Sequence, residues 1–276
     1  MNSMVSKYVS AAGIRTHYLE AGQGSPVVLL HSGEFGACGA LSWERTIPAL
    51  AEHFHVYAPD WLGFGKTEKL FSFEDMHAKR MRHMSAFLGE LGIEDADFIG
   101  NSMGGTMLLE EAARNPASWG MRRAIVVSGG GHIPDNASRQ LLSSYDGTLE
   151  YMQRLVKTLF VNPRIHTDQD YIQRRYELSR ELGAWECTAA VRFKAPWREQ
   201  KSSLNRTIDY SAVGVPVLLV AGRLDNLREA GYAEELQKQV PGAGLHVLDT
   251  AGHCPQIDEA EEFNRIIVDY LTRHRA

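Results

Sequence analysis

The sequence predicts an α/β fold in which a doubly wound, mostly parallel sheet is divided by a helical insertion. Short apolar runs typical of buried strands alternate with helical segments over residues 1–131, and this alternation returns over residues 210–276. Strands that alternate with helices form parallel sheets with helices on both faces. Residues 132–209 contain no apolar strand run and are mainly helical in character. We therefore expect a core in two parts, with a helical lid between them.

The first part of the core contains four apolar runs of strand type with helical segments between them. The expected strands cover residues 26–31, 55–59, 96–99 and 124–127. The expected helices cover residues 43–54, 76–91 and 106–114. Gly92 and the Asn115-Pro116 pair follow the last two of these helices, and such residues end helices. Because the strands are apolar along their length, we expect the sheet to be covered on both faces.

The lid and the second part of the core complete the chain. Helices are expected over 149–160 and 169–182 within the lid, where Trp185, Phe193 and Trp197 add aromatic bulk. Strands are expected again over 215–222 and 245–248, and a closing helix over 261–273. A helical insertion in an α/β core is typical of a lid over an active site.

Composition excludes several classes of function. The chain has 276 residues, a formal net charge of −5 and no basic cluster, which gives no electrostatic reason to bind nucleic acid or an anionic membrane. No apolar run approaches the roughly 18 residues of a membrane span. Cys38, Cys187 and Cys254 have no metal-ligand spacing and are expected to be free thiols, and the histidines form no metal set. We expect a cytoplasmic protein without cofactor, either a monomer or a homo-oligomer.

Residues 100–105, Gly-Asn-Ser-Met-Gly-Gly, are the most informative stretch of the chain. They match the G-x-S-x-G pattern of a nucleophile elbow and stand between an expected strand and an expected helix. A turn this tight holds the serine in strained backbone geometry and lifts its hydroxyl clear of the sheet. The glycines are needed because side chains there would collide with the neighbouring strand and helix. Ser102 is therefore the candidate nucleophile.

Asp225 and His253 complete a candidate catalytic triad. A serine hydroxyl needs a neighbouring imidazole, which a carboxylate holds in one tautomer. Asp225 follows the expected strand 215–222, and His253 follows the last expected strand. Ligands of open α/β sheets gather at these carboxyl ends, and the order Ser, Asp, His is that of known triads on such sheets.

An oxyanion hole requires two backbone N–H groups that point at the developing negative charge. The amide of Met103, directly after the nucleophile, is the first candidate. Gly33, in the loop after the first expected strand, is the second, because glycine lets the backbone approach the substrate closely. Ser32 is expected to position this loop through its hydroxyl. His31 is expected to be structural, and Asp60 to hold a turn.

The chain resembles the α/β-hydrolases and, within them, the meta-cleavage-product hydrolases of aromatic degradation. The elbow carries the resemblance together with residues 47–50, 58–65, 222–225, 252–253 and 262–265. It covers the whole core and is weakest in the lid. The resemblance implies an α/β-hydrolase fold and hydrolysis of a C–C bond in a 2-hydroxy-6-oxo-hexa-2,4-dienoate.

The resemblance also implies roles for individual residues. Ser102 would be the nucleophile, His253 the proton carrier and Asp225 its orienting group. Arg175 stands where the family has a lid arginine for the dienoate end of the substrate, although Arg174 competes for this assignment. A planar bidentate donor suits a carboxylate, so the implied substrate is a small anion with an apolar substituent. The resemblance places Asn101 in the same pocket.

Three departures from the family pattern bear on the substrate. Cys254 follows His253 where the family commonly has tryptophan. The oxyanion loop reads His-Ser-Gly-Glu over residues 31–34, where a glycine-rich sequence is frequent. Ser42 replaces a polar asparagine. We therefore include Ser32, Ser42 and Cys254 among the substrate-binding candidates.

Two other functions remain open from the sequence. A carboxylesterase or lactonase would use the same triad, because acyl transfer is shared and the pocket alone decides. A non-enzymatic receptor with a hydrolase fold belongs to another class, and the intact triad argues against it. Fold alone does not separate these possibilities.

Overall fold

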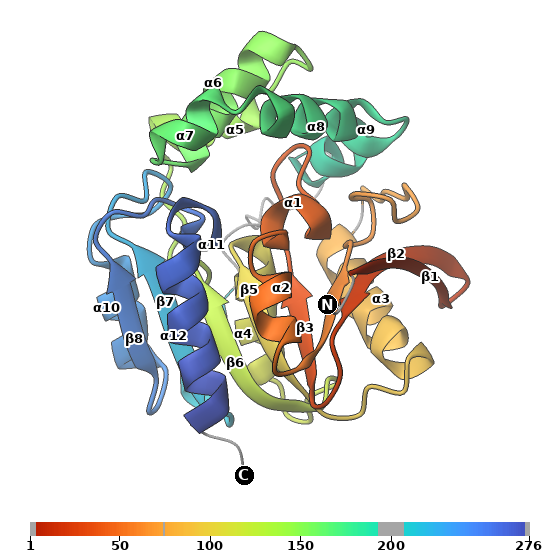
Figure 1. Cartoon of the computed structure of the whole chain (residues 1–276), viewed down its shortest axis with the longest axis vertical. Coiled ribbons are helices and arrows are strands. Elements are labelled where there is room, and N and C mark those ends of the chain that lie inside the picture. The colour runs from red at the N-terminus through yellow and green to blue at the C-terminus, as the bar shows by residue number, and fades with distance from the viewer. Residues whose placement is uncertain (1–3, 74, 193–206, 274–276) are drawn as a thin grey trace.

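The computed structural model describes residues 4–73, 75–192 and 207–273, and its centre is one eight-stranded sheet. The strands lie in the order β1-β2-β4-β3-β5-β6-β7-β8 (Figure 1). β1 and β2 pair antiparallel, as do β2 and β4, whereas the other neighbours pair parallel. The strands cover Val5–Ala11, Ile14–Ala21, Pro26–Leu30, His55–Pro59, Ala96–Asn101, Met121–Val127, Val217–Gly222 and Gly244–Leu248. The predicted fold class is confirmed.

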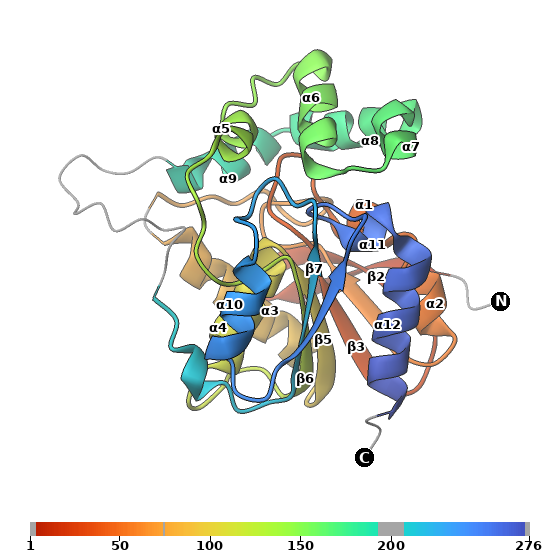
Figure 2. The same cartoon turned by 90° about the vertical axis from the view of Figure 1, so that its left-hand side faces the viewer.

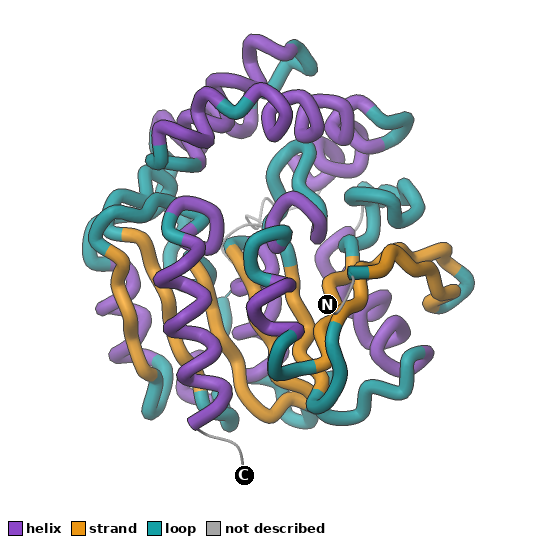
Figure 3. Tube along the Cα trace, in the orientation of Figure 1, coloured by secondary structure: helices purple, strands orange, loops and turns teal. Residues whose placement is uncertain are grey.

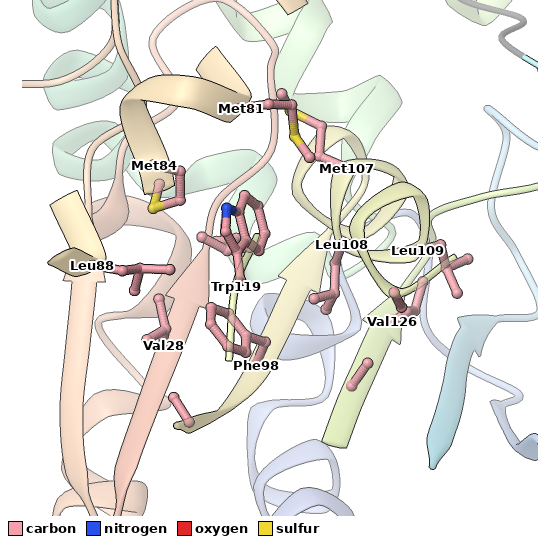
Figure 4. Close-up of a cluster of buried hydrophobic side chains, with 14 of the residues drawn as sticks. Val28, Met81, Met84, Leu88, Phe98, Met107, Leu108, Leu109, Trp119 and Val126 are labelled. Carbon is pink, nitrogen blue, oxygen red and sulfur yellow. The ribbon is translucent and has the colours of Figure 1, made fainter. Parts of the chain in front are cut away.

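Helices cover both faces of this sheet (Figure 3). Alternate residues of a strand point to opposite faces, so neighbouring positions of β3 and β5 enter two different cores. Val28 and Phe98 pack with side chains of α3, α4 and α10, whereas Leu29 and Ile99 pack with those of α1, α2 and α12. Figure 4 shows the first core, in which Trp119 lies against Phe98 between the sheet and the helices. The core helices are α1 Gly39–Trp43, α2 Ile47–Ala51, α3 Met76–Glu90, α4 Met103–Ala112, α10 Tyr232–Gln239, α11 Pro255–Asp258 and α12 Ala260–Arg273.

Two local features differ from the sequence-based prediction. The hairpin of β1 and β2 was not predicted, because β1 is largely exposed and mixes serine and lysine with apolar residues. The single helix expected over 43–54 is wrong: α1 ends at Trp43 and α2 begins at Ile47. Pro48 lies in the first turn of α2, where its missing N–H costs no helical hydrogen bond, whereas a longer helix would have lost one there.

Between β6 and β7 the described residues form helices and no strand, and the α-helices among them lie beyond the carboxyl ends of the parallel strands (Figures 1 and 2). Trp185 stacks on Phe35 of the loop after β3, with ring centroids 6.2 Å apart. Phe193 and Trp197 lie outside the described residues. The α-helices of this insertion, which we call the lid, are α5 Ala137–Ser143, α6 Leu149–Leu159, α7 Pro163–Thr167, α8 Gln169–Arg180 and α9 Ala184–Ala189, and short 3-10 helices cover Ala190–Arg192 and Tyr210–Ala212.

Candidate active site

Ser102 stands in the turn between β5 and α4 with a backbone that few non-glycine residues adopt. Its φ is 53° and its ψ is −111°, and its N–H donates to the carbonyl of Val127 at 2.8 Å. The turn is tight because neighbouring glycines leave room for it. A Cβ on Gly104 would lie 2.4 Å from the carbonyl oxygen of Leu30, and one on Gly100 would lie 2.6 Å from the backbone of Gly104. The sequence therefore forces the serine outward at the end of the sheet.

The structure brings Ser102, His253 and Asp225 into one chain of hydrogen bonds. The Oγ of Ser102 lies 2.8 Å from Nε2 of His253, whose Nδ1 lies 2.7 Å from Oδ2 of Asp225. Asp225 follows β7, and His253 lies in the loop between β8 and α11. If Nδ1 carries the proton and donates to the carboxylate, Nε2 is free to accept the serine proton. This is the arrangement that general-base activation of a serine requires.

Asp225 is held in its charged form although it is buried. Burial opposes ionisation, but the pKa of Asp225 lies below its usual value because the imidazole of His253 stabilises the carboxylate. The N–H of Leu227 donates to its other oxygen at 2.8 Å, and the charge of Arg228 contributes in the same direction. The carboxylate is thus available to orient His253 at neutral pH.

Arg228, which the sequence did not single out, fastens the Asp225 loop to the beginning of the lid. Its guanidinium is buried and donates to the carbonyls of Ser128 and Gly130, each at 2.7 Å, and of His132 at 3.2 Å. No spacing or motif in the sequence marks an arginine whose hydrogen bonds go to backbone carbonyls, so this role becomes visible only in the structure.

Gly33 and Met103 lie side by side next to Ser102. Met103 is the first residue of α4, so its N–H has no partner within the helix. A Cβ on Gly33 would lie 2.7 Å from Sδ and 3.1 Å from Cβ of Met103, so only glycine fits this contact without a shift.

The loop of Gly33 is positioned by His31 and Trp61. The backbone N–H of Trp61 donates to Nε2 of His31 at 3.0 Å, which leaves Nδ1 to donate to the carbonyl of Ser32 at 2.6 Å. Burial lowers the pKa of His31, so the imidazole remains neutral in this role. The interpretation of His31 as structural agrees with these bonds.

Glu34 lies in the middle of the site, although no sequence pattern indicated that its side chain would lie there. The hydroxyl of Ser32 donates to its Oε2 at 2.5 Å, and its Oε1 lies 3.9 Å from Nε2 of His253. Nη2 of Arg175, on the lid helix α8, lies 3.4 Å from the same Oε2. Ser32 and Arg175 are thus both brought to the triad, and Glu34 connects them to it.

Asn101 and Cys254 contact each other behind the triad. The amide of Asn101 donates to the carbonyls of His253 and Val127, both at 3.2 Å, and its Oδ1 lies 3.5 Å from Sγ of Cys254. Both side chains are buried. Burial raises the pKa of the Cys254 thiol well above its usual value. Ser42 is buried in α1, and among the described residues no hydrogen bond joins its side chain to the triad.

The loop that carries His253 is bonded to the end of lid helix α6. The N–H of His253 donates to the carbonyl of Leu159 at 3.2 Å. The carboxylate of Asp258 accepts N–H groups from Val161 at 3.1 Å, Asn162 at 3.0 Å and Gly252 at 2.8 Å. Hydrogen bonds from backbone N–H groups therefore hold the end of α6 against the loop that carries His253.

The chain is similar in sequence and in structure to known hydrolases. The model of the alpha/beta hydrolase family matches residues 27–266, which is most of the chain. The chain belongs to this family. It also belongs with the meta-cleavage-product hydrolases, because it is 30% identical to the 2-hydroxy-6-oxo-6-(2'-aminophenyl)hexa-2,4-dienoic acid hydrolase of Metapseudomonas resinovorans over 99% of this chain and 92% of that protein. The resemblance seen in the sequence is confirmed.

Further hydrolases support this placement. A 2-hydroxymuconate semialdehyde hydrolase of Pseudomonas putida is 32% identical over 97% of this chain and 94% of its own. Among solved structures, the meta-cleavage product hydrolase of Pseudomonas fluorescens superposes with a TM-score of 0.85 at 26% identity, covering 98% of both chains. An enol-lactonase of Burkholderia xenovorans shares the fold, with a TM-score of 0.77 at 21% identity over 96% of this chain and all of its own.

A second hydrogen-bonded Ser-His-Asp set occurs in this hydrolase at the edge of the sheet that β1 and β2 form. Ser6 Oγ lies 2.8 Å from Nε2 of His17, and Nδ1 of His17 lies 2.7 Å from Oδ2 of Asp60. Ser6 is an exposed residue within the regular strand β1. Asp60 also accepts the N–H groups of Gly39 and Lys66, at 2.7 and 2.8 Å, which agrees with its expected role in holding a turn.

Within the described part of this hydrolase, no group of three or more His, Cys, Asp or Glu side chains is placed to hold a metal ion. Among the same residues, no helix is both long and apolar enough to cross a bilayer.

Proposed function

We propose that this protein is a serine-triad hydrolase that cleaves a C–C bond in a 2-hydroxy-6-oxo-hexa-2,4-dienoate. The observation that carries the proposal is the chain Ser102–His253–Asp225, which lies beside a buried arginine with unused donors. Arg175 is 3% exposed, yet its contacts to Glu34 and to the hydroxyl of Tyr171 are both 3.4 Å long. Its Nε is buried and has no partner. A substrate carboxylate would satisfy these donors.

The proposed reaction begins with ketonisation of the substrate and continues with attack by Ser102. A proton leaves the 2-hydroxyl of the dienol and arrives at C5, which gives the keto form. Ser102 then attacks the C6 carbonyl while His253 removes its proton, and Asp225 stabilises the imidazolium. The C5–C6 bond breaks, its electron pair enters the dienolate, and His253 returns the proton to give 2-hydroxypentadienoate. Water finally releases the carboxylic acid from Ser102.

Other residues support this chemistry from nearby. The amides of Met103 and Gly33 form the oxyanion hole, where two preorganised donors each lower the barrier by about 3 kcal/mol. Asn101 and Cys254 hold the His253 loop in place behind the triad, and Ser32 holds Glu34. Ser42, which is buried in α1, remains a substrate-binding candidate. Three buried thiols that form no disulfide suit a cytoplasmic enzyme.

Ester or lactone hydrolysis is the second candidate, and Glu34 is the observation in its favour. Its carboxylate already neutralises much of the charge of Arg175, which makes the site less attractive to an anionic substrate and more suitable for a neutral one. The triad and the oxyanion hole would act on an ester carbonyl in the same way.

The two candidates separate in one experiment. The purified protein is given 2-hydroxy-6-oxo-6-phenylhexa-2,4-dienoate and p-nitrophenyl acetate, and the loss of dienoate absorbance is compared with the release of p-nitrophenolate. A kcat/KM that is higher for the dienoate supports C–C hydrolysis, and the reverse order supports the ester candidate.

A pair of neighbouring arginines provides the matched control. Arg175→Met should lower kcat/KM for the dienoate far more than for the ester. Arg174→Met, in which the lost arginine is 41% exposed and pairs with Glu44 and Asp170, should change neither. Equal effects of the two substitutions would remove Arg175 from the proposal.

A further inference from the structure

Glu34 introduces a carboxylate where the substrate carboxylate is expected to bind. Its side chain is 8% exposed, and its two oxygens face different partners. Oε2 accepts from the Ser32 hydroxyl and lies 3.4 Å from Arg175, whereas Oε1 lies 3.9 Å from Nε2 of His253. The charge of Glu34 thus lies between His253 and Arg175, the proposed receptor of the substrate carboxylate.

The position of Glu34 is fixed by the backbone of the lid. Gly36 has a φ of 72°, and a Cβ there would lie 2.1 Å from the carbonyl oxygen of Arg175. The N–H of Ala37 donates to the carbonyl of Glu34 at 3.0 Å and closes a turn. Because the loop packs directly on α8, the carboxylate of Glu34 and the guanidinium of Arg175 are held next to each other.

The contact is nevertheless an incomplete ion pair. A well-formed carboxylate–guanidinium pair has donor distances of about 2.7–2.9 Å and is often bidentate. Here one nitrogen lies at 3.4 Å and Nε of Arg175 has no partner. The guanidinium therefore retains donors for a second acceptor, beside an acceptor that is already charged.

We infer that Glu34 is a specificity-determining residue. Its carboxylate competes with the carboxylate of an anionic ligand for Arg175. Such a ligand therefore binds together with one proton. Two carboxylates at one site cannot both remain ionised without strong repulsion, so one of them takes up a proton. The inference rests on the proposed function in one respect: it takes Arg175 as the receptor of the substrate carboxylate.

The charged groups around Glu34 agree with this inference: Glu34 is ionised before an anion binds and carries a proton once the anion is bound. Burial opposes ionisation, but the pKa of free Glu34 lies below its usual value because Arg175 on α8, His253 in the β8–α11 loop and the Ser32 hydroxyl stabilise the carboxylate. Arg139 on α5, His31 after β3 and the thiol of Cys254 also interact with it electrostatically. An anion that approaches Arg175 adds the opposite influence and raises the pKa of Glu34.

Benzoate tests the inference, with benzamide as its uncharged match. Binding to the wild-type protein is measured by titration calorimetry at pH 7.5 in phosphate and in Tris, whose different ionisation enthalpies report proton uptake. We expect about one proton per benzoate and none per benzamide, because the second carboxylate at the site forces protonation. Uptake of no proton with benzoate, or no binding of benzoate to wild type and Glu34→Gln alike, would overturn the inference.

Glu34→Gln supplies the second test. The variant keeps the shape and removes the charge, so benzoate should bind about tenfold tighter or more without proton uptake, because a like-charge contact has been removed. Weaker binding together with a lower unfolding temperature would mean that Glu34 only fastens the loop to the lid. If this variant does not fold, the two-buffer measurement on wild type decides alone.

The outcomes also separate this inference from the proposed function. Proton-linked benzoate binding in a protein that cleaves no dienoate would refute the C–C reaction and leave the role of Glu34 intact. Efficient dienoate cleavage with proton-free benzoate binding would refute the role of Glu34 alone.

Discussion

Asn101, the residue directly before Ser102, donates its side-chain amide to the backbone carbonyl of His253 at 3.2 Å. The same amide donates to the carbonyl of Val127, also at 3.2 Å. One buried side chain therefore joins the ends of β5 and β6 to the loop that holds His253, the proposed catalytic base. Its hydrogen-bonding groups are used within the protein, which favours a positioning role over contact with substrate.

Asn101→Ala should accordingly lower kcat much more than it raises KM. We expect kcat to fall about 10- to 100-fold, because a small displacement of His253 disturbs proton transfer. The free energy of unfolding should fall by about 1–3 kcal/mol, since two buried carbonyls lose their donor. Steady-state kinetics and urea unfolding measure both. Asn264→Ala is the control, because Asn264 makes a similar bond to the carbonyl of Arg45 at an exposed site; a similar loss of kcat there would contradict the assignment.

Gly104→Ala should damage the elbow itself. Its new Cβ would lie 2.4 Å from the carbonyl oxygen of Leu30, so α4 must move away from β3 and take Ser102 with it. We expect a loss of about 1–3 kcal/mol in unfolding free energy, as for other overpacked core sites, and a large fall in kcat. Gly89→Ala in α3 meets nothing within 4 Å and should instead stabilise the protein by about 0.5–1 kcal/mol. Thermal unfolding that ranks the two variants in the opposite order would reject this account.

The three thiols should be unreactive in the folded protein over an unusually wide pH range. Burial raises the pKa of Cys38 to about 12 and raises those of Cys187 and Cys254 as well. Because the thiolate is the nucleophile, a raised pKa means less reactive thiolate at any given pH. With 5,5'-dithiobis(2-nitrobenzoate) at pH 8 we expect slow release of the chromophore from native protein and rapid reaction of all three thiols in guanidinium chloride. A native thiol that reacts as fast as glutathione would be inconsistent with this burial.

Fluorophosphonate labelling should distinguish the two Ser-His-Asp sets. Ser102 has a strained φ of 53° and lies beside the N-terminus of α4, whereas Ser6 occupies a regular strand. Only Ser102 combines a base with nearby amide donors, so the wild type and Ser6→Ala should be labelled equally and Ser102→Ala not at all. Mass spectrometry of the labelled peptide identifies the serine. A label on Ser6 would show that the base alone is enough.

The sequence allowed us to predict the parts of the site that depend on local constraints. The elbow needs its glycines within a few positions of Ser102, and Asp225 and His253 each follow an apolar strand, so their approach is a consequence of the parallel sheet. The hairpin of β1 and β2 escaped prediction because its turn, Ala12-Gly13, is a weak turn sequence and β1 is mostly exposed.

Contacts between distant segments could not be predicted in this way. The contact of Glu34 with Arg175 joins residues 141 positions apart, and it depends on how α8 packs on the loop after β3. No pattern in either segment indicates where its side chain points. Arg228 is similar, since its hydrogen-bond acceptors are backbone carbonyls that any sequence would supply.

The bonds between the His253 loop and the end of α6 set a limit on the modularity of this enzyme. A lid exchanged with that of a relative would have to present a carbonyl at the place of Leu159 and two amides at those of Val161 and Asn162. Without them, His253 and Asp258 would lose backbone partners in the core that the exchange was meant to leave intact. The natural junction for engineering therefore lies after Asn162, so that the first part of the lid is inherited together with the catalytic core.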